Sequence, residues 1–271
     1  MQRATIFVFL CTAAALAESD FNMPVAGIAR DAHQQAYLMY GVAGNFVLRG
    51  MLAREALDWA FAKDGGLVST GSDLLVIDSN GRLIRRRSAL GNDPVLGPMR
   101  AQSPALCWLP IQNELWQIGE RSDRKVPVQA ESIGGSVLAV ASLAGNQAEV
   151  AACRADRLWL LNIDLATGAV TRETAPGGLA GREACHSPAR HALLPFDGKL
   201  LLAAPQTLLI QDAAGNERRL KIPGAPGTQP EIRRAGEHWV EIDVAGLPAL
   251  LMRADSASPK LYRLPSAEAS R

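Results

Sequence analysis

The sequence predicts an all-β protein built from about six copies of one strand-rich unit. Each copy is an apolar strand that runs into an Asp and then a Gly-containing turn, as at residues 74–83, 158–168 and 208–216. Apolar anchor positions in successive copies lie 29, 40, 44, 49 and 42 residues apart, at Val47, Val76, Trp116, Leu160, Leu209 and Leu251. A period in the forties is what four short strands and their turns occupy in one blade of a β-propeller. We therefore expect a single β-propeller, most simply of six blades with four antiparallel strands each.

Turn signals divide most of the chain into regular four-stranded units. Asp-Gly at residues 64–65 and Asn-Gly at residues 80–81 are hairpin signals in the second unit, and Asp-Gly recurs at residues 197–198 in the fifth. The expected strands are 57–62, 66–70, 74–78 and 83–87 in the second unit; 137–143, 148–153, 158–164 and 169–174 in the fourth; 191–195, 199–204, 207–212 and 217–222 in the fifth; and 231–234, 238–244, 249–253 and 261–264 in the sixth.

The first and third units are less regular. The first leads almost directly into the second and is one strand short, and residues 18–23 are a candidate for the missing strand, because propellers often complete one blade from both termini. The strands expected here are 25–30, 36–40 and 46–49 in the first unit, and 105–109 and 114–118 in the third. Five blades remain the alternative count, if the first unit folds into the second.

The first 17 residues have the pattern of a secretory signal peptide. Arg3 precedes an apolar run at residues 4–11, and Ala15-Leu16-Ala17 forms an A-x-A-like cleavage site. The run is too short to span a bilayer, and no later segment approaches the ~20 apolar residues of a membrane-spanning helix. A lipid anchor on Cys11 is the alternative, although Leu10 stands where such a site needs a small residue. We expect residues 18–271 to form one exported domain, periplasmic or secreted.

Charge and composition exclude some functions. The chain has 28 Lys and Arg against 27 Asp and Glu, and removing the leader takes away only Arg3, so the mature chain is neutral. A neutral surface argues against nucleic acid as a partner. The sequence also has no G-x-S-x-G, H-E-x-x-H, P-loop or dinucleotide-binding glycine pattern. We expect a monomer that binds a protein, a peptide or a small molecule.

Three cysteines follow the leader, and an oxidising compartment permits one disulfide among them. Cys107 and Cys153 lie in second strands of neighbouring blades, whose sheets stack about 10 Å apart, which is too wide for a disulfide. Cys153 with Cys185 is therefore the favoured pair if a bridge forms. Three separate buried thiols are the simpler alternative.

Two groups of residues have the composition of a metal site. Cys185, His186 and His191 have a suitable spacing, and Cys153 could join them. Aspartates at strand ends could line a central channel and hold a divalent cation such as calcium; they are Asp31, Asp64, Asp78, Asp164, Asp197, Asp212 and Asp243. Most of these aspartates precede a turn, however, where a carboxylate accepts backbone N–H bonds without any metal. We therefore expect no cofactor.

Arginines and tryptophans recur at matching places in the units. Arg85, Arg86 and Arg87 form the densest charge run, which could bind phosphate, but similar basic residues mark the presumed outer strand of other units. Charge on outer strands prevents edge-to-edge pairing, so the run needs no ligand. The tryptophans lie within strands, where we expect them to wedge between stacked sheets; they are Trp59, Trp108, Trp116, Trp159 and Trp239.

The segment at residues 158–170, an apolar strand followed by Asp, two residues and Thr-Gly, resembles the repeats of bacterial secreted β-propellers of the YVTN and quinoprotein-like kind. Quinoprotein repeats usually carry a Trp four positions after the Thr-Gly, where this chain has Arg172. The resemblance therefore implies no quinone-binding site in this chain. The resemblance implies a propeller, export and binding as the usual use of the scaffold.

The sequence favours a non-enzymatic binding or scaffold propeller, with a metal-dependent hydrolase or lactonase as the alternative. Loops on a rigid scaffold usually carry function. The long connection at residues 174–188 is the best candidate, because its length exceeds what joining two neighbouring strands requires. We expect Arg182, Glu183 and His186 in it to contribute to any binding surface.

Overall fold

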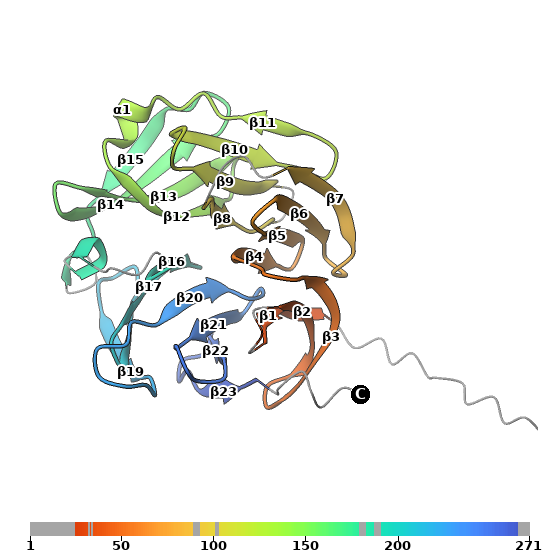
Figure 1. Ribbon diagram of the computed structural model, residues 1–271. Coiled ribbons are helices and arrows are strands. Elements are labelled where there is room, and N and C mark those ends of the chain that lie inside the picture. Colours follow the sequence, from red (N-terminus) through yellow and green to blue (C-terminus); the bar gives the residue numbers. More distant parts are fainter. Residues whose placement is uncertain are drawn as a thin grey trace, which may run out of the picture.

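The computed structural model describes residues 25–31, 33, 35–88, 93–100, 103–178, 183–186 and 191–264. Six antiparallel sheets stand around a common axis, as the blades of a β-propeller (Figure 1). Five sheets have four strands and the first has three. Consecutive strands pair within each sheet, so every blade is a meander, and the predicted six-bladed fold is confirmed.

The blades follow one another along the chain, and the first strand of each lies nearest the axis (Figure 1). The strands are β1 (Val25–Arg30), β2 (Ala36–Val42) and β3 (Asn45–Ala53) in blade 1; β4 (Asp58–Ala62), β5 (Gly65–Ser69), β6 (Asp73–Asp78) and β7 (Leu83–Ser88) in blade 2; β8 (Val95–Gly97), β9 (Ala105–Leu109), β10 (Glu114–Ile118) and β11 (Asp123–Lys125) in blade 3; β12 (Ser136–Leu143), β13 (Gln147–Arg154), β14 (Arg157–Asp164) and β15 (Val170–Thr174) in blade 4; β16 (Leu193–Phe196), β17 (Lys199–Ala204), β18 (Thr207–Gln211) and β19 (Glu217–Lys221) in blade 5; and β20 (Glu231–Arg234), β21 (Trp239–Asp243), β22 (Leu250–Arg253) and β23 (Leu261–Arg263) in blade 6.

Helix is confined to short connections in the described part of the chain. The helix α1 (Ala130–Ile133) joins blades 3 and 4, and the 3-10 turn η1 (Ala184–His186) precedes blade 5. No helix in the described part of the chain is long and apolar enough to cross a membrane.

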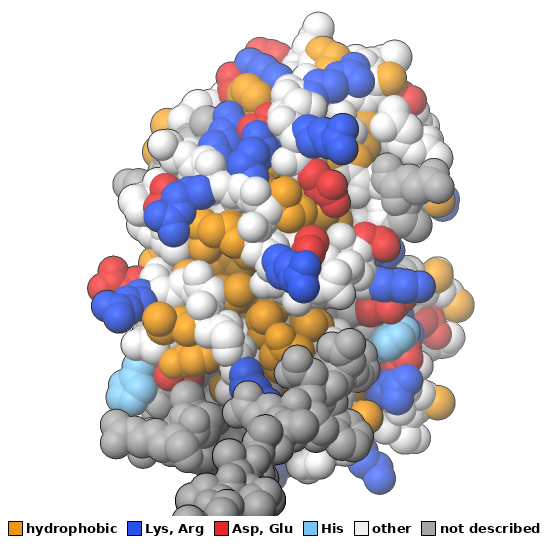
Figure 2. Space-filling view, turned by 90° about the vertical axis from the view of Figure 1, so that its right-hand side faces the viewer, with side chains coloured by type: hydrophobic (Ala, Val, Ile, Leu, Met, Phe, Trp, Pro, Cys, Tyr) orange, Lys and Arg blue, Asp and Glu red, His pale blue; other side chains and the backbone are white. Residues whose placement is uncertain are grey.

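The three-stranded blade leaves β3 as an outer edge. Met51 on this strand is 45% exposed, and Leu83 and Ile84 on β7 of the next blade are 50% and 38% exposed. Figure 2 shows this side of the molecule, where hydrophobic side chains gather below a group of Lys and Arg. Residues 18–23, the candidate for a fourth strand, lie outside the described residues, as does the predicted leader.

Aspartates cap the hairpin turns as the turn chemistry predicts. Asp78 Oδ1 accepts hydrogen bonds from the backbone N–H groups of Asn80 and Arg82, at 2.9 and 2.7 Å. Asp164 does the same for the turn after β14, and these bonds lower the pKa of its carboxyl group. Four of the seven strand-end aspartates, namely Asp31, Asp78, Asp164 and Asp212, are therefore occupied by their own turns.

The core consists of apolar layers between neighbouring blades. Trp59, Trp108 and Trp239 are at most 8% exposed and pack in three different layers, while Trp116 and Trp159 pack at the margins of two. The prediction that tryptophans wedge between stacked sheets is confirmed. Large aromatic side chains contribute most to such a core, because each buries 150–250 Å².

Arg85, Arg86 and Arg87 lie on β7, the outer strand of blade 2, as predicted. Arg85 and Arg87 both pair with Asp123 of β11, and the Arg87 guanidinium lies 4.8 Å from the Trp116 ring centroid. The run therefore also joins blade 2 to blade 3, which the sequence did not indicate.

Close backbone contact and an aromatic cluster join blade 6 to blade 1. The backbone N–H of Ile28 on β1 donates to the carbonyl oxygen of Ala235, which follows β20, at 2.7 Å. The backbones approach so closely that a Cβ atom on Gly27 would lie 2.0 Å from that same oxygen. Further out, Trp239 packs edge-on against Phe46 and Tyr262, with ring centroids 5.0 and 5.8 Å away. Within the described residues, the ring thus closes through packed side chains, the Ile28–Ala235 backbone hydrogen bond and the bonds of Arg30 on β1 to Glu241 and Asp243 on β21.

Candidate functional site

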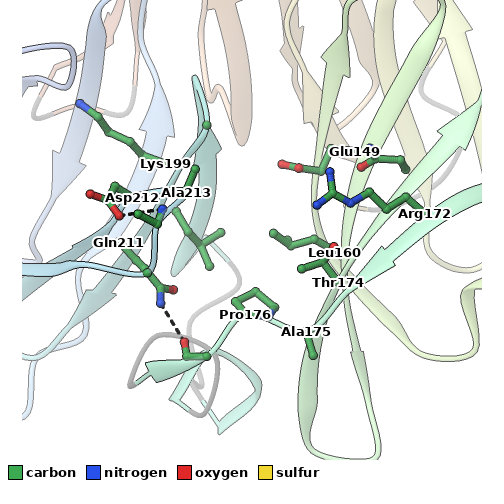
Figure 3. A pocket seen from close by; sticks show the side chains of 16 residues that line it. Glu149, Leu160, Arg172, Thr174, Ala175, Pro176, Lys199, Gln211, Asp212 and Ala213 are labelled. Atoms are coloured by element: carbon green, nitrogen blue, oxygen red, sulfur yellow. Dashed lines mark hydrogen bonds between the residues drawn. The ribbon is translucent and has the colours of Figure 1, made fainter.

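A groove with a volume of about 510 Å³ runs between blades 4 and 5 (Figure 3). This volume lies within the range of about 300–1,000 Å³ that is usual for ligand sites. One wall comes from β13, β14 and β15, and the other from β17, β18 and the turn that follows β18. The segment after β15, residues 175–177, lines the groove at one end. The groove therefore includes the start of the long connection that sequence reasoning selected.

The blade 4 wall carries a row of polar side chains. Glu149 pairs with Asn162 across β13 and β14, and Asn162 pairs with Arg172 across β14 and β15. Directly opposite residues in neighbouring strands project from the same face of a sheet, so the three side chains form one line. Leu160 lies two residues before Asn162 and therefore projects on the same side, where it pairs with Thr174. The wall is polar at one end and apolar at the other.

The blade 5 wall has a different character. Leu200 and Gln211 are opposite each other on β17 and β18, and both line the groove. The Gln211 side-chain amide donates to the carbonyl oxygen of Gly177 at 2.9 Å, which fixes the end of the groove (Figure 3). The Lys199 ammonium donates instead to the carbonyl oxygen of Ala254 in blade 6, at 2.7 Å. Its charge is thus directed away from the groove.

The charge of Glu149 is incompletely neutralised in the groove. Burial raises the pKa of Glu149, and the nearby Arg172 only partly opposes this effect. Asp212, at the opposite wall, is exposed, and hydrogen bonds from Asn216 lower the pKa of its carboxyl group. The Lys199 ammonium and the Asp212 carboxylate both point away from blade 4, so the charges that face the groove are those of Glu149 and Arg172 (Figure 3). A cationic group placed in the groove would compensate the incompletely paired charge of Glu149.

A disulfide fixes the connection beside the groove. Cys153 on β13 and Cys185 in η1 are bonded, with their Cα atoms 5.6 Å apart. This is the pair favoured from the sequence. Both cysteines pack at the layer between blades 4 and 5, together with Leu160. The bond therefore anchors the long connection to the blade that forms one wall of the groove.

We expect the double variant Cys153→Ala, Cys185→Ala to lose about 2–4 kcal/mol of unfolding free energy, because the bond closes a loop of 32 residues. Urea unfolding measures this loss.

Burial raises the pKa of Cys107, the free thiol within the described part of the chain, to about 12, so it should resist alkylation in the folded protein. A chemical test compares the number of thiols that can be alkylated before and after reduction. Two more thiols should react after reduction, and an equal number would contradict the disulfide.

The residues predicted for the loop are only partly placed. Glu183 is half-buried and His186 is exposed beside the disulfide, whereas Arg182 lies outside the described residues. Neither Glu183 nor His186 lines the groove. The groove residues Glu149 and Arg172 were missed, because their contribution depends on the space between two blades. The available signal was an acidic residue, Glu149, among the apolar residues that form most of its strand.

The two arrangements considered for a metal do not assemble in the described part of the chain. Cys153 and Cys185 are bonded to each other, and His191 Nδ1 lies 3.8 Å from Asp58 instead. Asp197 and Asp243 pair with arginines. No group of three or more His, Cys, Asp or Glu side chains among the described residues is placed to hold a metal ion.

No protein-family model matches the sequence, and no curated protein matches it. Similar solved structures include PorZ, a bacterial surface component of the type-IX secretion system of Porphyromonas gingivalis, at 12% identity and a TM-score of 0.52 over 90% of this chain and 38% of that chain. AztD from Citrobacter koseri is 14% identical over 90% of this chain and 72% of that chain, with a TM-score of 0.42. The WD40 domain of Neurospora crassa Pan2 is 9% identical over 90% and 80%, with a TM-score of 0.44. At these identities the likeness concerns the β-propeller fold alone.

Proposed function

We propose that this protein is a binding propeller that takes an extended peptide with basic side chains in the groove between blades 4 and 5. The observation that carries the proposal is the groove itself, in which Glu149 is half-buried, incompletely paired and set beside an apolar stretch. Surface loops and interblade clefts of a rigid ring are suited to binding, and no step of chemistry is needed to explain the side chains present.

The two walls suit alternating side chains of an extended chain. Successive side chains of such a chain point to opposite sides. A basic side chain could then reach Glu149, while its apolar neighbours contact Leu160 and Leu200. We infer a partner segment in which basic and apolar residues alternate.

The probe for this proposal is a capped nonapeptide in which lysine and valine alternate, with a glutamate and valine peptide as its acidic counterpart. We expect the basic peptide to bind and the acidic one to bind at least tenfold more weakly, as measured by fluorescence anisotropy. Glu149→Gln should weaken binding of the basic peptide about tenfold, which corresponds to about 1.4 kcal/mol. Arg172→Gln should strengthen it, because a competing cation is removed.

Binding should also depend on pH. Burial raises the pKa of Glu149, so its carboxylate is charged above that pKa and neutral below it. Affinity for the basic peptide is therefore expected to fall as the pH is lowered through this pKa, and Glu149→Gln should remove that part of the dependence. Because the charged form is disfavoured in the fold, the glutamine variant should be at least as stable as the wild type.

Steric block of the groove provides a test that is independent of charge. Ala213 is exposed in the turn after β18 and lines the groove, so Ala213→Trp should abolish binding without disturbing the core. Ala43→Trp is the matched control, since Ala43 is equally exposed in the turn between β2 and β3 of blade 1. Equal binding by both variants, or equal affinity for the two peptides, would refute the proposal.

Export of this propeller remains part of the proposal, supported by Arg3, the apolar run and Ala15-Leu16-Ala17. We expect the mature protein to begin at Glu18. N-terminal sequencing of protein recovered from the periplasmic or culture fraction measures this, and an intact leader on cytoplasmic protein would contradict it.

A further inference from the structure

A second, smaller cavity lies on the axis of the ring, away from the groove. Its volume is about 30 Å³, and residues of β4, β8, β12, β16 and β20 line it. One side is apolar, with Val95, Leu96 and Val140 among its residues, and the other side is charged. A space of this size holds on the order of one or two water-sized groups.

The charged side contains two deeply buried arginines. The side chains of Arg233 and Arg234 on β20 are each only 3% exposed. Arg233 pairs with Asp58, with Nε 3.4 Å from Oδ1, and with Glu231, and its guanidinium lies 4.9 Å from the Trp59 ring centroid. Arg234 donates to the carbonyl oxygen of Glu237 at 3.0 Å and lies 3.4 Å from Asp197. Buried charges are normally paired and fully hydrogen-bonded, because desolvation is costly.

Hydrogen-bond donors remain in excess around this cavity. Among the described residues, Nη1 of Arg233, Nε of Arg234 and the indole Nε1 of Trp59 are buried and have no hydrogen-bond partner, and Nε of Arg233 has only its ion-pair contact with Asp58. The unpartnered acceptor nearby is Oε1 of Glu241, whose other oxygen accepts the backbone N–H of Arg30 at 3.1 Å. Unmet buried donors of this kind usually indicate an unseen water or ion.

The sign of the charge also favours an anion. Arg100 lines the same cavity with its side chain 31% exposed, and it pairs with Asp197. Burial, followed by the nearby charge of Arg100, lowers the pKa of Arg234 to about 9, so a negative group there would stabilise the charged guanidinium. Burial disfavours the charge of Arg233, but the carboxylates of Asp58, Glu231 and Glu241 outweigh it and raise the pKa of this arginine, so the positive charge that an anion would compensate is that of Arg234.

We propose that the axial cavity binds a small monoanion, a halide ion or a carboxylate group, through the unpartnered donors of Arg233, Arg234 and Trp59. The small volume excludes bulky oxyanions, and the arginines disfavour a metal cation. The exposed part of Arg100 marks the entrance. This site is independent of the groove, so either proposal can fail without the other.

The test is thermal unfolding in sodium chloride or sodium formate, each replaced stepwise by sodium isethionate, a bulky sulfonate, at constant ionic strength. An anion that binds only the folded state raises stability with its concentration. We expect Tm to rise with chloride, formate or both in the wild type. The rise should be lost in Trp59→Phe, which keeps a smaller aromatic ring but removes the indole N–H, and in Arg234→Lys. The control Arg253→Lys, at a surface pair with Asp255, should respond like the wild type.

A rise in Tm with chloride alone would identify a halide as the ligand. A rise with formate would identify a carboxylate group. Equal responses in all four proteins, or none in the wild type, would overturn the proposal. If the cavity variants do not fold, a crystal of the wild type soaked in sodium bromide tests the proposal instead. An anomalous peak between Arg233 and Arg234 supports the site, and its absence there rejects it.

Discussion

Gly27→Ala is expected to destabilise the protein by about 3 kcal/mol or more, although it adds a single methyl group. The new Cβ atom would lie 2.0 Å from the carbonyl oxygen of Ala235 and 2.7 Å from its carbon, and both are backbone atoms. Blades 1 and 6 would have to separate, which strains the packing and breaks the hydrogen bond from Ile28 to Ala235. Because the ring closes at this point, the cost is not confined to one strand.

Urea unfolding of Gly27→Ala measures this effect, and Gly71→Ala is the matched control. Nothing lies within 4 Å of a Cβ atom built on Gly71, so that variant should stay within about 0.5 kcal/mol of the wild type. Equal stability of the two variants would show that blades 1 and 6 are not in contact as described.

Trp239→Ala is expected to cost about 3–5 kcal/mol, the usual range for removing a buried aromatic side chain. Trp239 is 8% exposed and packs edge-on against Phe46 of blade 1 and Tyr262 of its own blade. The substitution leaves a cavity in the layer that closes the ring. It also removes aromatic pairs that contribute about 0.5–1.5 kcal/mol each beyond burial.

Trp159→Ala in blade 4 is the comparison for this prediction. Trp159 is only half-buried, with Arg154 and Arg157 over its ring, so its loss should be clearly smaller. Gly27→Ala and Trp239→Ala disturb one interface, so the double variant should lose less than the sum of the two. Additive losses, or a larger loss at Trp159, would contradict the described closure.

The blades could be predicted because their signals are local. An apolar strand that ends in Asp and a Gly turn, as at Asp78 and Gly81, specifies a hairpin wherever it occurs in the chain. The short strand β8 was missed, because its three residues carry too little pattern, whereas the basic pair Arg124 and Lys125 indicated the outer strand that the structure shows as β11. The outer position of Arg85 was predicted, whereas its ion pair with Asp123 requires knowing which blade stands beside it.

Both candidate sites depend on distances between blades, which no local pattern encodes. Glu149 lies on a regular strand, and only the gap toward blade 5 makes its charge accessible. The positions of Arg233 and Arg234 in the sequence do indicate that these arginines are buried. They occupy the first strand of a unit, nearest the axis, where Leu194 and Val140 stand in other blades. A charge in an innermost strand predicts a buried polar centre.

The central claim, that the groove between blades 4 and 5 binds basic peptides, is tested most directly by hydrogen–deuterium exchange with and without the lysine and valine nonapeptide. We predict slower exchange in peptic fragments covering residues 147–177 and 198–216, which form the two walls, and no change in blades 1 and 2. Protection that maps to other blades, or none at saturating peptide, would contradict the account.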